Sequence, residues 1–490
     1  MVPPHQSRLG ARHRLRHADA RYWQTTTFIW DYSLSSWVHA QLDPAVMRRQ
    51  ILHWVGLDIN SHFGTEWLTG GPVGYWYSVN QYALVRLVAD YVRFTGDVAF
   101  LEVEVEGRDG SRRRMMRHVR DWALAWRDKR TPSGLADYGG IDNLLECVST
   151  YIHEVASLQA ANVWSMRTAA GLSRLLGETD EAAALEAEAE ALLPKVLELY
   201  REGDGFFDAR YPDGTRHATR HCYDFATVGT TIADDLPEAQ RSEMVRFFET
   251  ELRSPSWMRA LSPRDADAGF SVRPDHQWNG AYPAWPADAG RSAIALGGRA
   301  GVMEWLEGLR RTTRQGPPGQ AHFVEEAAPT VDGGARKAPG QFPYLIDWAC
   351  SSAGAWCEFI VEGCWGRGRP RRCRHGDLAV RRRRRPHDDD GRGQQQAGRL
   401  SATGPGLARW LRLRTVSGVV GFVTARRFAL GPAQPKSSRP GAPRGAGSTD
   451  CCAQVLAVIG QHVGDGQQQS GLLLWRGLHT KSREIVGDGQ

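Results

Sequence analysis

The sequence predicts an all-α fold, an (α/α)6 toroid of helical hairpins, on the basis of three observations. Apolar residues recur every three or four positions through most of residues 22–365, the period of a helix with one buried face. The helical segments come in consecutive pairs that alternate between apolar and half-polar, as in an inner and an outer ring. No unit of 30–50 residues recurs, which argues against a superhelical repeat array, the competing all-α interpretation.

Three predicted helical pairs fill the first half of this region. Their ranges are 31–42 with 44–55, 79–95 with 98–128, and 151–176 with 180–200. Asp43 followed by Pro44 is a helix start, because Asp caps free N–H groups and proline fits the first helical position. Gly96 and Gly177 are predicted stops. Residues 106–113 form a polar interruption of the fourth helix.

The second half continues the series. The predicted ranges are 223–232 with 237–252, 288–296 with 300–311, and finally 342–361. Strand-like stretches are few and short, such as the run from Gly205 to Asp208 between two turn signals. About eleven helices in consecutive hairpins, with long loops at one end, indicate a closed double ring.

The composition changes abruptly after Trp365. Residues 366–490 carry 23 Lys and Arg against 8 Asp and Glu, whereas the first 365 residues carry 38 against 47. The formal charge of +6 therefore comes from the C-terminal segment, and the acidic body gives no reason to expect a nucleic-acid partner. We expect a basic N-terminal segment, 1–21, a helical domain, 22–365, and an Arg-, Gly- and Gln-rich tail, 366–490. The tail is predicted to be disordered or the product of a reading-frame shift.

Cysteine spacing and hydropathy argue against a zinc site, a disulfide framework and a membrane span. The eight cysteines include no CxxC pair, so neither a zinc site nor a disulfide framework is predicted. No stretch of 18 apolar residues occurs, so no membrane span is expected. Residues 1–20 lack the apolar centre of a signal peptide, which makes a cytoplasmic location the default expectation. The sequence leaves the oligomeric state open.

Two acidic segments, almost two hundred residues apart, carry the chemistry. Asp142 follows Gly139-Gly140-Ile141, and Glu325 follows Phe323-Val324. Each lies in a loop just outside a helical pattern, where catalytic groups on a rigid scaffold usually sit. Hydrolysis of a glycosidic bond needs two such carboxyl groups, one to protonate the leaving oxygen and one to activate water on the opposite face of the sugar.

Each of these acids has a rival and a structural alternative. Glu146 could replace Asp142, which could instead cap a helix beginning near Leu144. Glu326 could replace Glu325, although adjacent residues of an extended loop point in opposite directions, so only one can face a pocket. Both glutamates could also be solvated loop charges.

Aromatic residues between the acidic segments are candidates for sugar binding. Trp278, Tyr282 and Trp285 could pack on the apolar faces of a pyranose, and the alternative is that they are ordinary core residues. The candidates for binding sugar hydroxyls are Asp275, His276 and Asn279.

Residues near the two ends of the helical region could complete such a pocket. Trp30 could line its floor, with Asp31 hydrogen-bonded to a sugar hydroxyl, although Asp31 could equally be a helix cap. Gln341 precedes the final predicted helix and could reach the pocket. No metal or organic cofactor is needed for this chemistry, and the expected partner is a carbohydrate substrate.

The helical body resembles the six-hairpin glycosidases, in particular the group that holds trehalases, mannosyl-oligosaccharide glucosidases and bacterial mannosylglycerate hydrolases. The similar segments, in order, are Phe28-Ile29-Trp30-Asp31, Gln81 to Glu102, Gly140-Ile141-Asp142-Asn143, Trp278 to Pro286, Phe323 to Pro329, and Gly340-Gln341. The resemblance implies an (α/α)6 glycoside hydrolase with Asp142 as general acid and Glu325 as general base. It implies an α-linked gluco- or manno-configured substrate, and acids separated widely enough for a water predict inversion.

Two other functions remain open from the sequence. The first is another sugar-directed reaction on a similar toroid, either α-L-rhamnoside cleavage or epimerisation by His217 and His221, which lie four residues apart. The second is a truncated toroid that binds carbohydrate without cleaving it.

Overall fold

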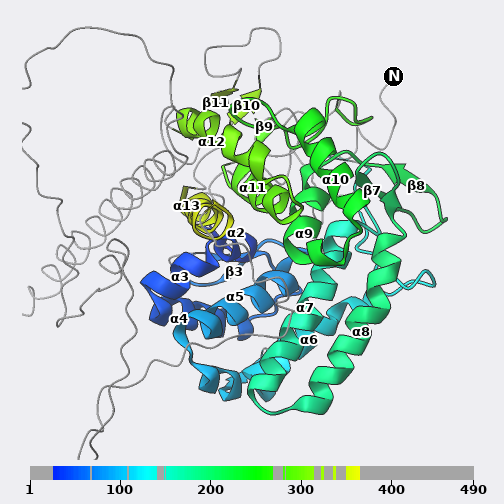
Figure 1. The fold of residues 1–490 in the computed structure, drawn as a ribbon. Helices are drawn as coiled ribbons and strands as arrows, with labels where there is room; N and C mark the ends of the chain where they lie inside the picture. The colour runs from blue at the N-terminus through cyan, green and yellow to red at the C-terminus, as the bar shows by residue number, and fades with distance from the viewer. Residues whose placement is uncertain are drawn as a thin grey trace, which may run out of the picture. The chain divides into compact units, whose positions relative to one another are not determined.

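The computed structural model is mainly helical, which confirms the all-α class (Figure 1). It describes residues 26–66, 69–107, 110–140, 148, 150–268, 280–281, 283–313, 322–324, 335–337 and 349–364. The predicted N-terminal segment, 1–21, and the predicted tail, 366–490, both lie outside these residues, so the domain division stays a prediction.

Six helices, one from each of the five predicted pairs and one from the final predicted helix, form a cyclic set of contacts. They are α2 (Ile29–Leu34), α5 (Asn80–Thr95), α7 (Ala156–Leu175), α9 (Cys222–Thr231), α11 (Trp285–Ala295) and α13 (Ala349–Glu358). Each contacts the next in this order, and α13 contacts α2. This closed order is consistent with the inner ring of the predicted toroid.

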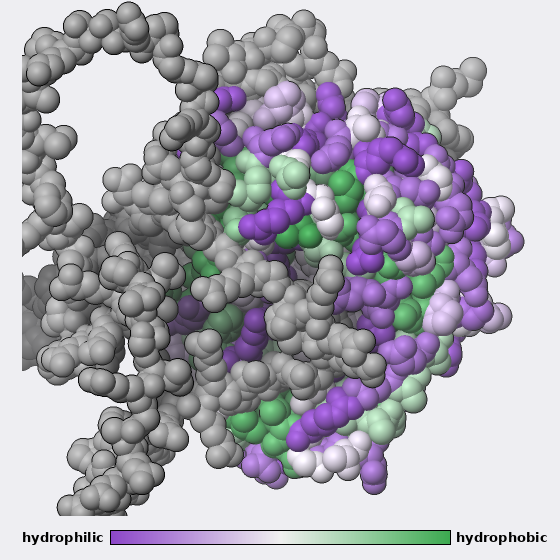
Figure 2. Space-filling view, viewed as in Figure 1, coloured by the Kyte–Doolittle hydropathy of each residue, from purple (hydrophilic) through white to green (hydrophobic). Residues whose placement is uncertain are grey.

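The remaining helices lie between members of this set along the chain, with two of them between α2 and α5. They are α3 (Ser36–Leu42), α4 (Pro44–Val55), α6 (Met115–Leu124), α8 (Thr179–Leu197), α10 (Glu238–Phe247) and α12 (Arg299–Thr313). In α7 most side chains are buried, whereas α8 buries only one stripe, from Ala182 to Val196 at intervals of three and four residues. A helix apolar around most of its circumference belongs inside, and one with a single stripe belongs on the surface. Hydrophilic residues accordingly cover much of the visible face around α8 and β8 (Figure 2).

Short 3-10 and π segments complete the helical structure. They are η1 (Val98–Glu102), η2 (Ala125–Lys129), η3 (Ala233–Asp235), η4 (Phe248–Leu252) and η6 (Phe359–Cys364).

The predicted helix boundaries are largely confirmed. The Asp43 carboxylate accepts a hydrogen bond from the backbone N–H of Val46, 3.0 Å away, and Pro44 is the first residue of α4. Gly96 ends α5 with a φ of 71°, in the left-handed region that favours glycine. The predicted helix 31–42 is divided at Ser35 into α2 and α3.

Small antiparallel sheets are more numerous than the sequence predicted, although the predicted strand-like run from Gly205 to Asp208 is confirmed by a strand over Phe206–Arg210. Their strands are β1 (Thr26–Phe28), β2 (Gly64–Glu66), β3 (Pro72–Val73), β4 (Glu104–Glu106), β5 (Arg112–Arg114), β6 (Tyr200–Arg201), β7 (Phe206–Arg210), β8 (Arg216–Ala218), β9 (Gly280–Ala281), β10 (His322–Val324) and β11 (Ala335–Lys337). The helix predicted over 98–128 is confirmed only in part, because η1 covers 98–102 and α6 begins at Met115, whereas β4 and β5 lie between them. Val105 is buried between exposed Glu104 and Glu106, so this stretch alternates with the period of a strand and pairs with β5.

A buried ion network joins three helices of the cyclic set. The Arg86 guanidinium of α5 donates to Glu358 Oε2 of α13 over 2.7 Å, and Arg291 of α11 approaches the same oxygen at 2.8 Å. Glu358 has no solvent-exposed surface. Asp90 and Asp288 lie beside the two arginines, at 3.9 and 3.6 Å. Because a buried charge is tolerated only when it is paired, these contacts hold α5, α11 and α13 together.

From the raised pKa of the Glu358 carboxyl we predict how the free energy of unfolding depends on pH. Burial raises its pKa to about 7, although Arg86 and Arg291 act to lower it. The folded chain therefore binds more protons at Glu358 than the unfolded chain does between about pH 4.5 and pH 7. This group's contribution is most favourable below that window and is lost as the pH rises through it, by up to about 3 kcal/mol.

Glu358→Gln should therefore show a flatter dependence of unfolding free energy on pH than the wild type, measured by urea unfolding at pH 5, 6, 7 and 8. Glu186→Gln, which removes a surface partner of Arg174, should leave the wild-type slope unchanged. Parallel profiles for wild type and Glu358→Gln would contradict the assignment.

Candidate functional site

The loop that contains Asp142 begins and ends at a neck of backbone hydrogen bonds immediately before α7. The N–H of His153 donates to the carbonyl of Gly139 over 2.8 Å, and the N–H of Tyr138 donates to the carbonyl of His153 over 3.1 Å. Glu154 and Arg210 of β7 exchange two further backbone bonds, of 3.1 and 3.0 Å. The two ends of residues 140–152 are therefore fixed beside each other and against β7.

The neck carries an aspartate–histidine pair. His153 Nδ1 lies 2.9 Å from Asp137 Oδ1, which also accepts a hydrogen bond from the N–H of Gly139 at 2.7 Å. His153 has a φ of 65°, the only positive value for a non-glycine residue among those described. This left-handed conformation is uncommon outside glycine, and it is imposed here by the bonds on both sides of the residue.

A second set of bonds ties the end of the Asp142 loop to the segment that leads towards Trp278. Asp267 Oδ2 accepts from the backbone N–H and the hydroxyl of Thr150, at 3.0 and 2.9 Å. The Asp265 carboxylate accepts from the N–H of Asp267 at 2.8 Å and from that of Arg220 at 2.6 Å. Since α9 begins two residues after Arg220, the approaches to α7 and α9 are held together.

The same hydrogen-bonded path continues to the strand before Glu325. The carbonyl of Ala260 accepts a hydrogen bond from the N–H of Cys222, the first residue of α9, over 2.9 Å. The N–H of Ala260 donates to the carbonyl of Gly280 in β9, also over 2.9 Å. β9 pairs with β10, where Gly280 is opposite Phe323. Glu325 is the residue after the end of β10. Described residues thus connect the base of the Asp142 loop with the strand that precedes Glu325, and we call this path the hydrogen-bonded belt.

Most of the residues predicted to form the site lie outside the described residues. They are Asp142, Glu146, Asp275, His276, Trp278, Asn279, Tyr282, Glu325, Glu326 and Gln341. Their roles and mutual distances stay predictions.

Three predicted site residues are described. Trp30 is 9% exposed, and its ring lies 6.1 Å from that of Tyr82. Asp31 lies in the first turn of α2, whose capping position is Phe28, so it is not the helix cap. Burial raises the pKa of Asp31 to about 7. Trp285 is 2% exposed and packs edge-on against Tyr223 at 4.6 Å, so it offers little surface for a sugar in this structure.

The start of α9 is connected to α7 through a buried carboxyl. Asp224 accepts hydrogen bonds from the hydroxyl of Tyr151 and from the N–H of Ser157, the latter at 2.7 Å. Burial raises the pKa of Asp224 to about 7 and that of Tyr151 well above its ordinary value. The bonds fix the position of Tyr151, one residue after Thr150 of the belt.

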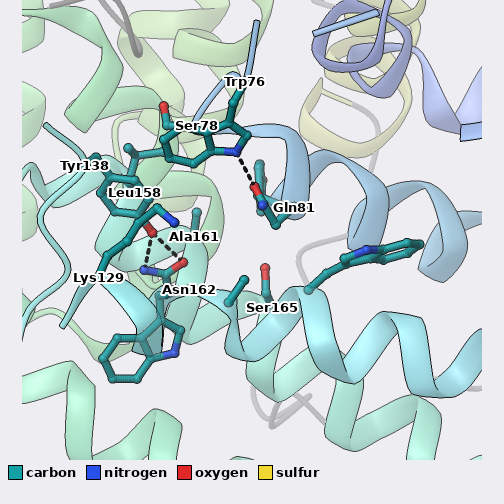
Figure 3. A pocket seen from close by; sticks show the side chains of 13 residues that line it. Trp76, Ser78, Gln81, Lys129, Tyr138, Leu158, Ala161, Asn162 and Ser165 are labelled. Carbon is teal, nitrogen blue, oxygen red and sulfur yellow. Dashed lines mark hydrogen bonds between the residues drawn. The ribbon is translucent and has the colours of Figure 1, made fainter. Parts of the chain in front are cut away.

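An aromatic pocket lies between α5, η2 and α7, beside the neck. Its enclosed part has room for about one water molecule, and the wider depression of about 370 Å³ around it is open to solvent. The indole N–H of Trp76 donates to Gln81 over 3.4 Å, and the Tyr138 hydroxyl exchanges hydrogen bonds of 2.8 and 3.0 Å with Asn162 (Figure 3). The amine of Lys129 is 4.5 Å from the centre of the Trp76 ring. Tyr138 belongs to both the pocket and the neck.

Sequence reasoning missed both the pocket and the Asp137–His153 pair. A possible signal for the pocket was the aromatic run from Tyr75 to Tyr77 just before an amphipathic helix. No comparable signal exists for the pair, because its partners are sixteen residues apart on opposite sides of a loop.

Comparisons with known proteins leave the family open. No protein-family model and no curated protein matches the sequence. Among solved structures, a rhamnosidase from Klebsiella oxytoca with rhamnose bound matches with a TM-score of 0.48 and 13% identity, over 70% of this chain and 58% of its own. A GH78 family rhamnosidase of Bacillus sp. GL1 matches with a TM-score of 0.46 and 12% identity, over 68% of this chain and 31% of its own. A sialidase matches with a TM-score of 0.44 and 13% identity, over 59% of this chain and 26% of its own.

This chain therefore spans less than two thirds of each of these three proteins, and TM-scores below 0.5 do not transfer an activity to it. The three matches do not single out the trehalase-containing group. Within the described residues, no helix is both long and apolar enough to cross a membrane, and no group of three or more His, Cys, Asp and Glu side chains is placed to hold a metal ion.

The left-handed backbone of His153 in the neck should make stability sensitive to the residue type at this position. His153→Asn should keep stability close to the wild type, because asparagine tolerates the left-handed region. His153→Val should lower the unfolding free energy by at least about 1–2 kcal/mol, since a β-branched residue is strained there. Urea unfolding measures both.

His217→Val is the matched control, because His217 lies on β8 with an ordinary strand backbone and stacks on Tyr211. Equal stability of His153→Val and His153→Asn would show that the neck does not impose this conformation.

Proposed function

We propose that this chain is an inverting glycoside hydrolase that acts on an α-linked gluco- or manno-configured sugar. The observation that supports the proposal is the hydrogen-bonded belt, which connects the base of the Asp142 loop, through Thr150 and Asp267, with β10 just before Glu325. Two acids separated by almost two hundred residues thus belong to segments whose described ends are fixed to one framework. The cyclic helix contacts and the motif order support the same assignment.

In the proposed reaction, the Asp142 carboxylic acid gives its proton to the glycosidic oxygen as the bond from that oxygen to the anomeric carbon breaks. The Glu325 carboxylate takes a proton from a water molecule, whose oxygen bonds to the anomeric carbon from the opposite face. The products are a free alcohol and a sugar of inverted configuration. Exchange of one proton with solvent at each carboxyl group restores the enzyme, and no cofactor takes part.

The substrate-binding residues of the proposal are Trp30, Asp31, Asp275, Trp278, Asn279, Tyr282, Trp285 and Gln341. Of these, Asp31 has a neutral carboxylic acid for part of the time near pH 7, because burial raises its pKa to about 7. A carboxyl group in that state can both donate to and accept from sugar hydroxyls.

The epimerase alternative is less well supported. His217 stacks on Tyr211 at 3.9 Å, whereas His221 is buried, stacks on Tyr223 at 5.4 Å and accepts from its N–H at the start of α9. The two imidazoles have separate surroundings and one of them has a capping role, which does not suit a pair that shares a substrate.

Replacement of the two acids tests the proposal. The wild type, assayed against a panel of aryl α- and β-glycosides and natural disaccharides, should release a sugar whose first-formed anomer, followed by NMR, is inverted. Asp142→Asn and Glu325→Gln should each lower kcat by at least about a hundredfold, because each removes a proton-transfer group.

Glu146→Gln and Glu326→Gln are the matched controls and should retain most of the activity. A retained anomeric configuration would remove the inverting mechanism. Full activity in Asp142→Asn or Glu325→Gln, or a wild type inactive on every glycoside, would remove the proposed function.

A further inference from the structure

The aromatic pocket beside the neck is rich in hydrogen-bond donors and contains no acid. Its lining includes three tryptophans and two tyrosines, but no Asp or Glu. The amide groups within it are already used, since Gln81 accepts from Trp76 and donates to Asn60, and Asn162 is bonded to Tyr138 (Figure 3). What the pocket can offer to a ligand therefore comes from other groups.

Two of those groups are buried donors without a described partner. The indole N–H of Trp126 and the hydroxyl of Ser165 line the pocket and form no hydrogen bond in the structure. Trp126 is 2% exposed and Ser165 is 3% exposed. Leaving such a group unsatisfied is unfavourable, so a ligand or water that accepts from either donor would be favoured.

The third group is the ammonium of Lys129. It lies over the Trp76 ring, and no described carboxylate is within ion-pairing distance of it. Burial lowers the pKa of Lys129, with only a partial opposing effect of neighbouring Asp128. A partly desolvated ammonium without a salt-bridge partner attracts an anion more strongly than a solvated one.

We propose that this pocket is a subsite for the carboxylate of an acidic ligand, such as a sugar acid. The carboxylate oxygens would accept hydrogen bonds from Trp126 and Ser165 and pair with Lys129, while the aromatic walls pack on the carbon skeleton of the ligand. A carboxylate is small enough for a narrow pocket and accepts on both oxygens, which matches a lining with the Trp126 N–H and the Lys129 ammonium as donors and no carboxylate.

The proposal deepens the proposed function by naming an acidic substrate class, and that role rests on the proposed function. Binding itself does not rest on it, because the pocket is described independently of Asp142 and Glu325. A binding measurement therefore separates the two.

The experiment compares binding of D-glucuronate and D-glucose to the full chain, by intrinsic tryptophan fluorescence and by calorimetry. Glucuronate should bind at least about tenfold more tightly, and its affinity should fall with added salt. Lys129→Met should remove this preference. Trp126→Phe and Ser165→Ala, which delete one donor each, should each weaken glucuronate binding about threefold to tenfold.

Lys195→Met is the matched control, because Lys195 is a surface residue paired with Glu198, and it should bind like the wild type. Equal affinities for the two sugars, no binding of either, or an unchanged preference in Lys129→Met would overturn the subsite. If a purely structural water satisfies Trp126 and Ser165, both donor variants will bind glucuronate like the wild type, which also overturns it. Hydrolysis of neutral glycosides alone would leave the proposed function standing while the subsite falls.

Discussion

The rest of the structure depends on the pairing of Glu358 with Arg86 and Arg291. This interaction joins residues 272 positions apart in sequence and fixes the last helix of the cyclic set, α13, against α5 and α11. A carboxyl group with no exposed surface needs its partners in place, so the contacts of Glu358 with Arg86 and Arg291 restrict how α5, α11 and α13 pack together. Ordinary apolar packing alone would allow small shifts among them.

The hydrogen-bonded belt is held in position by the helices behind it. The bonds from Thr150 to Asp267, from Arg220 to Asp265 and from Ala260 to Gly280 include residues that precede α7, α9 and α11, respectively. Their positions follow from those of the helices behind them, as is common where function is carried by loops on a rigid scaffold. His153 has a left-handed backbone, which a histidine seldom adopts, so the surrounding hydrogen bonds also hold a strained residue in place.

Features that depend on one or two neighbouring residues could be predicted from the sequence. Features that depend on contacts between residues distant in sequence could not. Asp43 with Pro44, and Gly96, were recognisable as helix ends, because capping and left-handed backbone depend on single residues. The β4–β5 hairpin was missed because one buried valine between two glutamates is too short a pattern to outweigh a long helical one. The roles of Asp142 and Glu325 were predicted from their residue type together with the resemblance to six-hairpin glycosidases, whereas the pocket required knowledge that Lys129, Ser165 and Trp126 share one space.

The most direct test of the central claim is the separation of the Asp142 and Glu325 carboxyl groups in a crystal structure of the chain with a sugar bound. The account predicts about 6.5–9.5 Å, with the anomeric carbon between them, as inversion requires. Carboxyl groups on different sides of the molecule, or separated by much more than about 12 Å, could not act on one glycosidic bond and would contradict it.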